Sequence, residues 1–129
     1  MTLITMGIIG AGRIGKLHAD NLLSRVEGVR LKAITDPFLD EGWATSRSIP
    51  VTGNDHRVIL DDPEIDAVLI GSPSPQHAPQ MIEVAQAGKH IFCEKPIALD
   101  PKVIRNALAE VEKAGVKLQV GFNRRFDPS

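Results

Sequence analysis

The sequence predicts an α/β chain in which a parallel sheet is covered by helices on both faces. Three observations predict this class. Short apolar runs alternate with segments of helical spacing, the connections between them are short, and three glycines follow the first apolar run. Because strand–helix–strand crossovers are right-handed, such a chain winds into a doubly wound sheet. At 129 residues, with 43% apolar and 24% charged residues, it has the size and composition of one soluble domain.

Six predicted strands alternate with five predicted helices. Strands are identified as short apolar runs, and helices by apolar residues that recur every three or four positions. In chain order the elements are strand 3–9, helix 13–26, strand 30–35, helix 39–48, an irregular stretch 49–65 with a short strand and a short helix, strand 67–70, helix 79–87, strand 90–93, helix 101–114 and strand 117–121.

Glycines and a cap mark several helix ends. Gly28, Gly88 and Gly115 each follow a helical segment, where glycine readily takes the conformation that ends a helix. Asp100 is placed to cap the last helix, ahead of Pro101 at its first position. Six strands connected in this way fit the two mononucleotide-binding halves of a Rossmann fold.

The turn after the first strand reads GAGRIG, from residue 10 to residue 15. In a strand-to-helix turn, Gly10 permits the sharp bend, Gly12 lets the backbone approach a pyrophosphate, and Gly15 lets the helix pack against the sheet. The unpaired amides and the dipole at the helix start favour the phosphate charge. The turn therefore predicts a dinucleotide site.

Asp36 ends the second strand, about 20 residues after the last of these glycines. A carboxylate there accepts hydrogen bonds from the adenosine ribose hydroxyls and repels the 2′-phosphate of NADP. Pro37 follows it, and no nearby arginine is present to hold that phosphate, so NAD is favoured. A methyltransferase that uses S-adenosylmethionine places glycines and an acidic residue in the same way, and at this point it stays open.

Two segments of the second half follow predicted strands: GSPSPQH begins at Gly71 and CEKP begins at Cys93. The carboxyl ends of strands border the crevice in which such sheets bind ligands. Lys95 in the second segment is placed to donate a hydrogen bond to a reacting oxygen.

Five segments together, GIIGAGRIGKLHA, ITDP, SPSPQH, EKP and GFNRRFDP, resemble the nucleotide-binding half of the Gfo/Idh/MocA oxidoreductases. The order and spacing of the segments make the resemblance specific over nearly the whole chain. It implies NAD as the cofactor and hydride transfer to NAD from a secondary hydroxyl of inositol or a related sugar or polyol.

The resemblance also implies roles for individual residues. Lys95 would be catalytic and would contact cofactor and substrate, Glu94 would lie near the nicotinamide ribose, and the Lys95–Pro96 bond would be cis. Asn123 and Arg125 would join Lys95 in binding the substrate. The implied cofactor contacts are Gly10, Gly12, Arg13, Ile14, Gly15, Asp36, Ser72, Pro73, His77, Glu94, Lys95 and Arg124.

Members of this family have a second domain that supplies an Asp, a His and much of an oligomer interface. The sequence stops at Ser129, so we expect an NAD-binding Rossmann domain at 1–121, the start of a connection at 122–129, and the second domain to be absent. We expect such a truncated chain to bind NAD with little turnover, and the full-length enzyme to be a homo-oligomer. A non-catalytic NAD-binding sensor or regulatory module is the alternative, although a sensor has no need of the EKP turn.

Other features argue against further partners. The net charge of −1 gives no indication of nucleic acid, and no apolar stretch approaches the roughly 20 residues that span a membrane. With Cys93 as the single cysteine, no internal disulfide can form, and a reducing, cytoplasmic setting is expected. No cluster has metal-ligand spacing, so no metal is expected. We expect His18 to pack within the first helix and His56 to be solvated.

Overall fold

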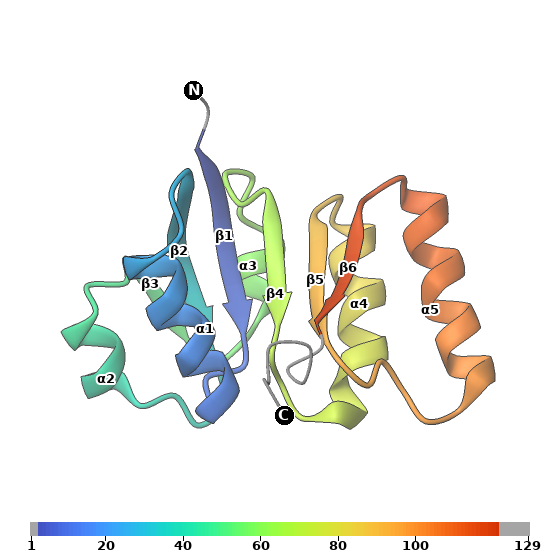
Figure 1. The fold of residues 1–129 in the computed structure, drawn as a ribbon, viewed down its shortest axis with the longest axis horizontal. Helices are drawn as coiled ribbons and strands as arrows, with labels where there is room; N and C mark the ends of the chain where they lie inside the picture. The colour runs from blue at the N-terminus through green and yellow to red at the C-terminus, as the bar shows by residue number, and fades with distance from the viewer. Residues whose placement is uncertain (1–2, 122–129) are drawn as a thin grey trace, which may run out of the picture.

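The computed structural model describes residues 3–121, and within them a six-stranded parallel sheet has the order β3-β2-β1-β4-β5-β6 (Figure 1). This is the strand order of a Rossmann fold, so the predicted doubly wound sheet is confirmed. The strands are β1 (Ile4–Ile9), β2 (Val29–Thr35), β3 (Val51–Gly53), β4 (Ala67–Ile70), β5 (His90–Glu94) and β6 (Leu118–Gly121). The helices are α1 (Arg13–Ser24), α2 (Glu41–Ser46), α3 (Arg57–Leu60), α4 (His77–Gln86) and α5 (Pro101–Ala114), with a 3₁₀ turn at Ser74–Gln76.

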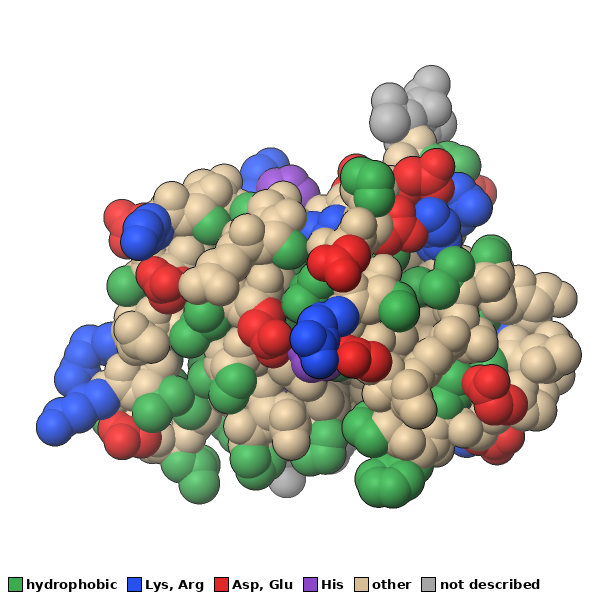
Figure 2. Space-filling model, turned by 180° about the vertical axis from the view of Figure 1, so that it is seen from behind, with side chains coloured by type: hydrophobic (Ala, Val, Ile, Leu, Met, Phe, Trp, Pro, Cys, Tyr) green, Lys and Arg blue, Asp and Glu red, His purple; other side chains and the backbone are tan. Residues whose placement is uncertain are grey.

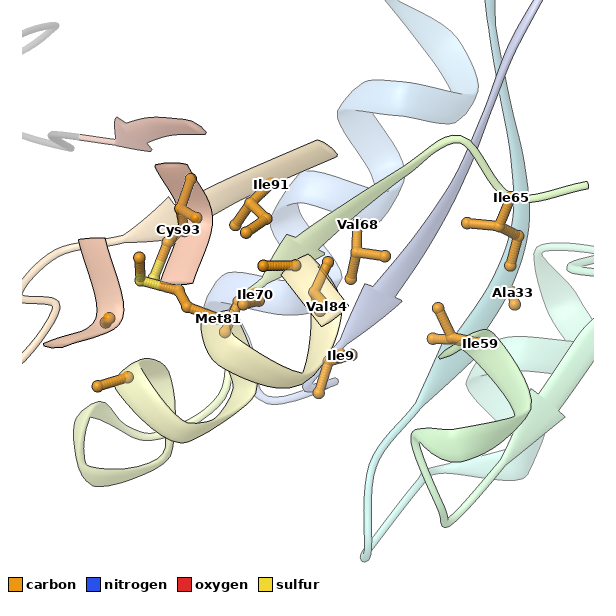
Figure 3. Close-up of a cluster of buried hydrophobic side chains, with 14 residues drawn as sticks. Ile9, Ala33, Ile59, Ile65, Val68, Ile70, Met81, Val84, Ile91 and Cys93 are labelled. Carbon is orange, nitrogen blue, oxygen red and sulfur yellow. The ribbon is translucent and has the colours of Figure 1, made fainter. Parts of the chain in front are cut away.

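Two apolar cores hold helices against opposite faces of the sheet. On one face, β-strand side chains such as Ile70 and Val68 meet Ile59 of α3 and Met81 and Val84 of α4, and these side chains converge in Figure 3. The other core packs α1 and α2 against the opposite side chains of β1, β2 and β4; its buried residues include Ile8, Ala19, Leu31, Ile34, Ala44 and Leu69. Successive residues of a strand point to opposite faces, which explains why Ile8 and Ile9 enter different cores.

Helix α4 begins at His77, two residues before the predicted start at Pro79. A proline in the first turn of a helix costs little, because the N–H groups there have no partner within the helix. Pro79 was therefore an unreliable marker of the helix start.

The surface seen from behind mixes acidic, basic and apolar side chains (Figure 2), in keeping with a net charge near zero. None of the helices described in residues 3–121 has the length and apolar character needed to cross a membrane.

Candidate functional site

A cleft of about 720 Å³ runs along the carboxyl edge of the sheet, past the ends of five strands. The segments that follow β3, β2, β1, β4 and β5 line it in that spatial order. The cleft therefore extends past five neighbouring strands, an arrangement that suits an extended ligand. The lining residues are Ile9, Gly10, Gly12, Arg13, Ile14, Thr35, Asp36, Pro37, Phe38, Asn54, His56, Gly71, Ser72, Pro73, Ser74, Gln76, His77, Gln80, Glu94 and Lys95.

The glycine turn leaves no room for side chains at two positions. Gly10 has a φ of +105°, and a Cβ there would lie 2.5 Å from the backbone nitrogen of Ser72. A Cβ on Gly15 would lie 1.8 Å from the carbonyl oxygen of Gly10. Gly12 differs, because a Cβ on it would meet nothing within 4 Å. Gly12 lines the cleft, so the space next to it is open to a ligand.

Asp36 fixes the end of β2 to this turn. Its carboxylate accepts hydrogen bonds from the N–H of Ala11, at 2.7 Å, and from the N–H of Phe38, at 2.8 Å. A carboxylate has about four acceptor positions, so two remain for a ligand. The side chain therefore organises the turn and still has capacity for ribose hydroxyls.

His77 joins the two loops that border the other half of the cleft. Its side chain is buried, with 2% exposure. Nδ1 lies 2.8 Å from the carbonyl oxygen of Pro96, and Nε2 lies 2.5 Å from that of Ser72. Since both ring nitrogens face backbone carbonyls, the ring positions the loop after β4 and the EKP turn relative to each other.

Glu94 and Lys95 form the β5 end of the cleft. Glu94 is 6% exposed and is hydrogen-bonded to His18 of α1. The N–H of Lys95 donates to the carbonyl oxygen of Gly121 at 3.3 Å, and the Lys95–Pro96 peptide bond is cis, as expected. Burial, followed by the charge of Glu94, raises the pKa of the neighbouring Cys93 thiol to about 12.

The structure brings most of the predicted site residues to one cleft. Of the predicted set within residues 3–121, Gly15 alone lies outside the lining, packed beneath Gly10. Asn123, Arg124 and Arg125 lie outside the described residues. No three or more His, Cys, Asp or Glu side chains in the described part of the chain are grouped to hold a metal ion.

Sequence reasoning missed several lining residues at the β3 and β2 ends. The His56 side chain is 27% exposed, and its Nε2 lies 3.0 Å from Oε1 of Glu83, a contact that the expectation of a solvated side chain did not include. Phe38 is 93% exposed at the rim of the cleft. β3 is short and only weakly apolar, so the sequence did not locate the end of this strand, beyond which Asn54 and His56 lie. Phe38 lies three residues after the end of β2, and its closeness to the end of a predicted strand was the available signal for it.

Comparisons with known proteins give one consistent answer. The model of an oxidoreductase family with an NAD-binding Rossmann fold, GFO_IDH_MocA, matches residues 4–122. An uncharacterized oxidoreductase of Bacillus subtilis, YrbE, is 52% identical over 127 residues, which is 97% of this chain and 37% of that protein. The scyllo-inositol 2-dehydrogenase (NAD(+)) of the same organism is 38% identical over 98% of this chain and 37% of that protein.

A solved structure shows the same fold. The scyllo-inositol dehydrogenase of Lactobacillus casei, crystallised with bound NAD(H) and scyllo-inositol, superposes with a TM-score of 0.90 at 35% identity. The match covers 98% of this chain and 38% of that one. The chain thus spans less than two fifths of the length of each of these relatives.

Proposed function

Because the chain belongs to the oxidoreductase family with an NAD-binding Rossmann fold, we propose that the cleft holds NAD(H) as part of a polyol dehydrogenase. In this proposal the adenosine ribose lies at Asp36, the diphosphate lies over the turn at Gly12, and the nicotinamide half extends to Glu94 and Lys95. The substrate we propose is a secondary alcohol of inositol or a related sugar or polyol.

The observation that supports this most strongly is the continuity of the cleft from Asp36 to Lys95 across the glycine turn. An acidic group at one end and free space beside the glycine turn in the middle match the order of ribose and diphosphate in a dinucleotide. Lys95 lies beyond them, on the side where the nicotinamide and a substrate would be placed. A Cβ added to Gly12 would meet nothing within 4 Å, so the open space beside the turn has room for the diphosphate.

NAD, when bound, supplies the hydride acceptor. The chain's own residues bind and orient it: Asp36 holds the ribose hydroxyls, and the amides of the turn hold the diphosphate. Lys95, exposed at the β5 end, is proposed to donate a hydrogen bond to the substrate oxygen and so to orient the carbon that gives up hydride. Two relatives of this chain are named for inositol dehydrogenation, which supports the substrate class.

The decisive experiment is calorimetric titration of the 129-residue chain with NAD, NADH and NADP. We expect saturable binding of NAD and NADH with one site, and weaker binding of NADP. Failure to bind any of the three at millimolar concentration would refute the proposed function.

Turnover is tested separately, because a hydride transfer from an alcohol also needs a base and a wall that excludes water. We propose that these 129 residues bind the cofactor but oxidise polyols very slowly. A spectrophotometric assay with myo- or scyllo-inositol and NAD, followed at 340 nm, checks this. Steady turnover at a rate of about 1 per second or more would contradict it, since that is an ordinary rate for an enzyme.

A further inference from the structure

His18 and Glu94 make a hydrogen bond that the mechanism above does not use. They lie 76 residues apart in the sequence, on α1 and at the end of β5, and Nε2 of His18 contacts Oε1 of Glu94. The side chains are 21% and 8% exposed, so the contact is largely shielded from water. An ionised carboxylate only accepts hydrogen bonds, so with Glu94 ionised the donor in this contact is Nε2–H of His18.

The surroundings hold both side chains in place. The His18 ring packs edge-on against Phe92, with ring centroids 5.8 Å apart and an interplanar angle of 66°. Phe92 is in turn confined by β6, because a Cβ on Gly121 would lie 2.7 Å from its ring. The same added Cβ would lie 3.7 Å from Cδ of Glu94. Three elements, α1, β5 and β6, thus restrict the orientation of this carboxylate.

Glu94 lines the cleft at the end opposite Asp36, with the glycine turn between them. A dinucleotide has two riboses, one on each side of its diphosphate. With one ribose at Asp36, the second falls on the Glu94 side of the turn. The bond from His18 occupies one acceptor position of the Glu94 carboxylate, which leaves others for hydroxyl groups.

We propose that His18 is a positioning residue for the cofactor: its Nε2–H orients the Glu94 carboxylate toward the hydroxyls of the second ribose. This inference rests on the proposed function, because it needs a dinucleotide in the cleft. It gives His18 a role in affinity for one half of the ligand, where the sequence had suggested packing within the helix.

The test compares NADH with ADP, which has the adenosine and the diphosphate but lacks the second ribose. Calorimetry on the 129-residue chain measures both dissociation constants for wild type, His18→Leu and His18→Gln. His18→Leu removes the donor, and we expect NADH to bind about five- to tenfold more weakly while ADP affinity stays within about twofold. His18→Gln keeps an N–H donor, and we expect it to recover most of the loss.

Two further variants sharpen the result. Leu17→Ala, on an exposed neighbour in α1, is the matched control and should leave both affinities unchanged. Glu94→Gln should weaken NADH binding, and the double variant with His18→Leu should lose little more than Glu94→Gln alone, since both changes break one interaction. ADP binding by each variant also shows that its site is folded.

The outcomes separate the two proposals. If the wild type binds neither NADH nor ADP, the proposed function fails. If the wild type binds both and His18→Leu weakens them equally, or weakens neither, the positioning role of His18 is overturned while the cofactor site stands. Additive losses in the double variant would also overturn it.

Discussion

The carboxylate of Asp36 accepts a hydrogen bond from the backbone N–H of Ala11, at 2.7 Å. This contact connects the end of β2 to the glycine turn that follows β1. The acidic residue and the turn are therefore fixed relative to each other before any ligand arrives. Preorganisation of this kind lowers the entropic cost of binding.

Replacement of Asp36 should weaken the binding of NAD and reduce the preference over NADP. In Asp36→Ala the ribose hydroxyls lose a charged acceptor, so we expect NADH to bind about ten- to a hundredfold more weakly. The 2′-phosphate of NADP no longer meets a negative charge, so its affinity should fall less or rise. Calorimetric titration measures both. An unchanged ratio of the two dissociation constants would contradict the assignment of the adenosine ribose to Asp36.

Alanine at Gly15 and at Gly12 should separate folding from binding. Gly15→Ala places a Cβ 1.8 Å from the Gly10 carbonyl oxygen, so we expect a loss of more than about 3 kcal/mol in the free energy of unfolding. Gly12→Ala meets no protein atom within 4 Å, so stability should change by less than about 1 kcal/mol.

The same Cβ on Gly12 enters the space proposed for the diphosphate, so Gly12→Ala should abolish NADH binding while the chain stays folded. Urea denaturation followed by circular dichroism and NADH titration provide the two measurements. A Gly12→Ala variant that binds NADH as tightly as wild type would show that the diphosphate lies elsewhere.

Local patterns were sufficient for most of the fold. The strand at Ala67–Ile70 and the helix at Pro101–Ala114 have the predicted bounds. A short apolar run marks the strand, and a capping residue, a proline and a glycine mark the two ends of the helix, so both signals are local in the sequence. Helix α1 ends at Ser24, two residues before its predicted end. The apolar spacing continues to Val26, but the helix stops earlier, and periodicity alone does not locate the final turn.

Contacts between distant segments were beyond sequence reasoning. Nothing local pairs His18 with Glu94 or His77 with the carbonyl oxygen of Pro96, since each contact depends on how the helices pack on the sheet. The sequence features that indicate a nucleotide also left S-adenosylmethionine open. The match to an NAD-binding family resolves the choice in favour of NAD, and this match extends over residues 4–122.

Cys93 should be unreactive in the folded chain. Its side chain is fully buried, and burial raises the pKa of the thiol from 9.0 to about 12. Because the folded state holds this proton more tightly, the thiol's contribution to stability is complete below pH 9 and is lost as the pH rises from 9 to about 12. Ellman's reagent at pH 8 should label the chain only after urea unfolds it. Rapid labelling without urea would contradict the burial.

Loss of the His77 ring should destabilise the chain and loosen the cleft. In His77→Leu, the carbonyl oxygens of Ser72 and Pro96 lose their ring partner inside the protein, so we expect a loss of about 2–4 kcal/mol in the free energy of unfolding. NADH affinity should fall too, because both loops line the cleft. His90→Leu is the matched control: His90 is exposed and its Nδ1 accepts one bond from the Lys117 N–H, so the loss should stay below about 1 kcal/mol. Urea denaturation of the two variants measures the difference, and equal losses would show that the bridge between the loops contributes nothing of its own.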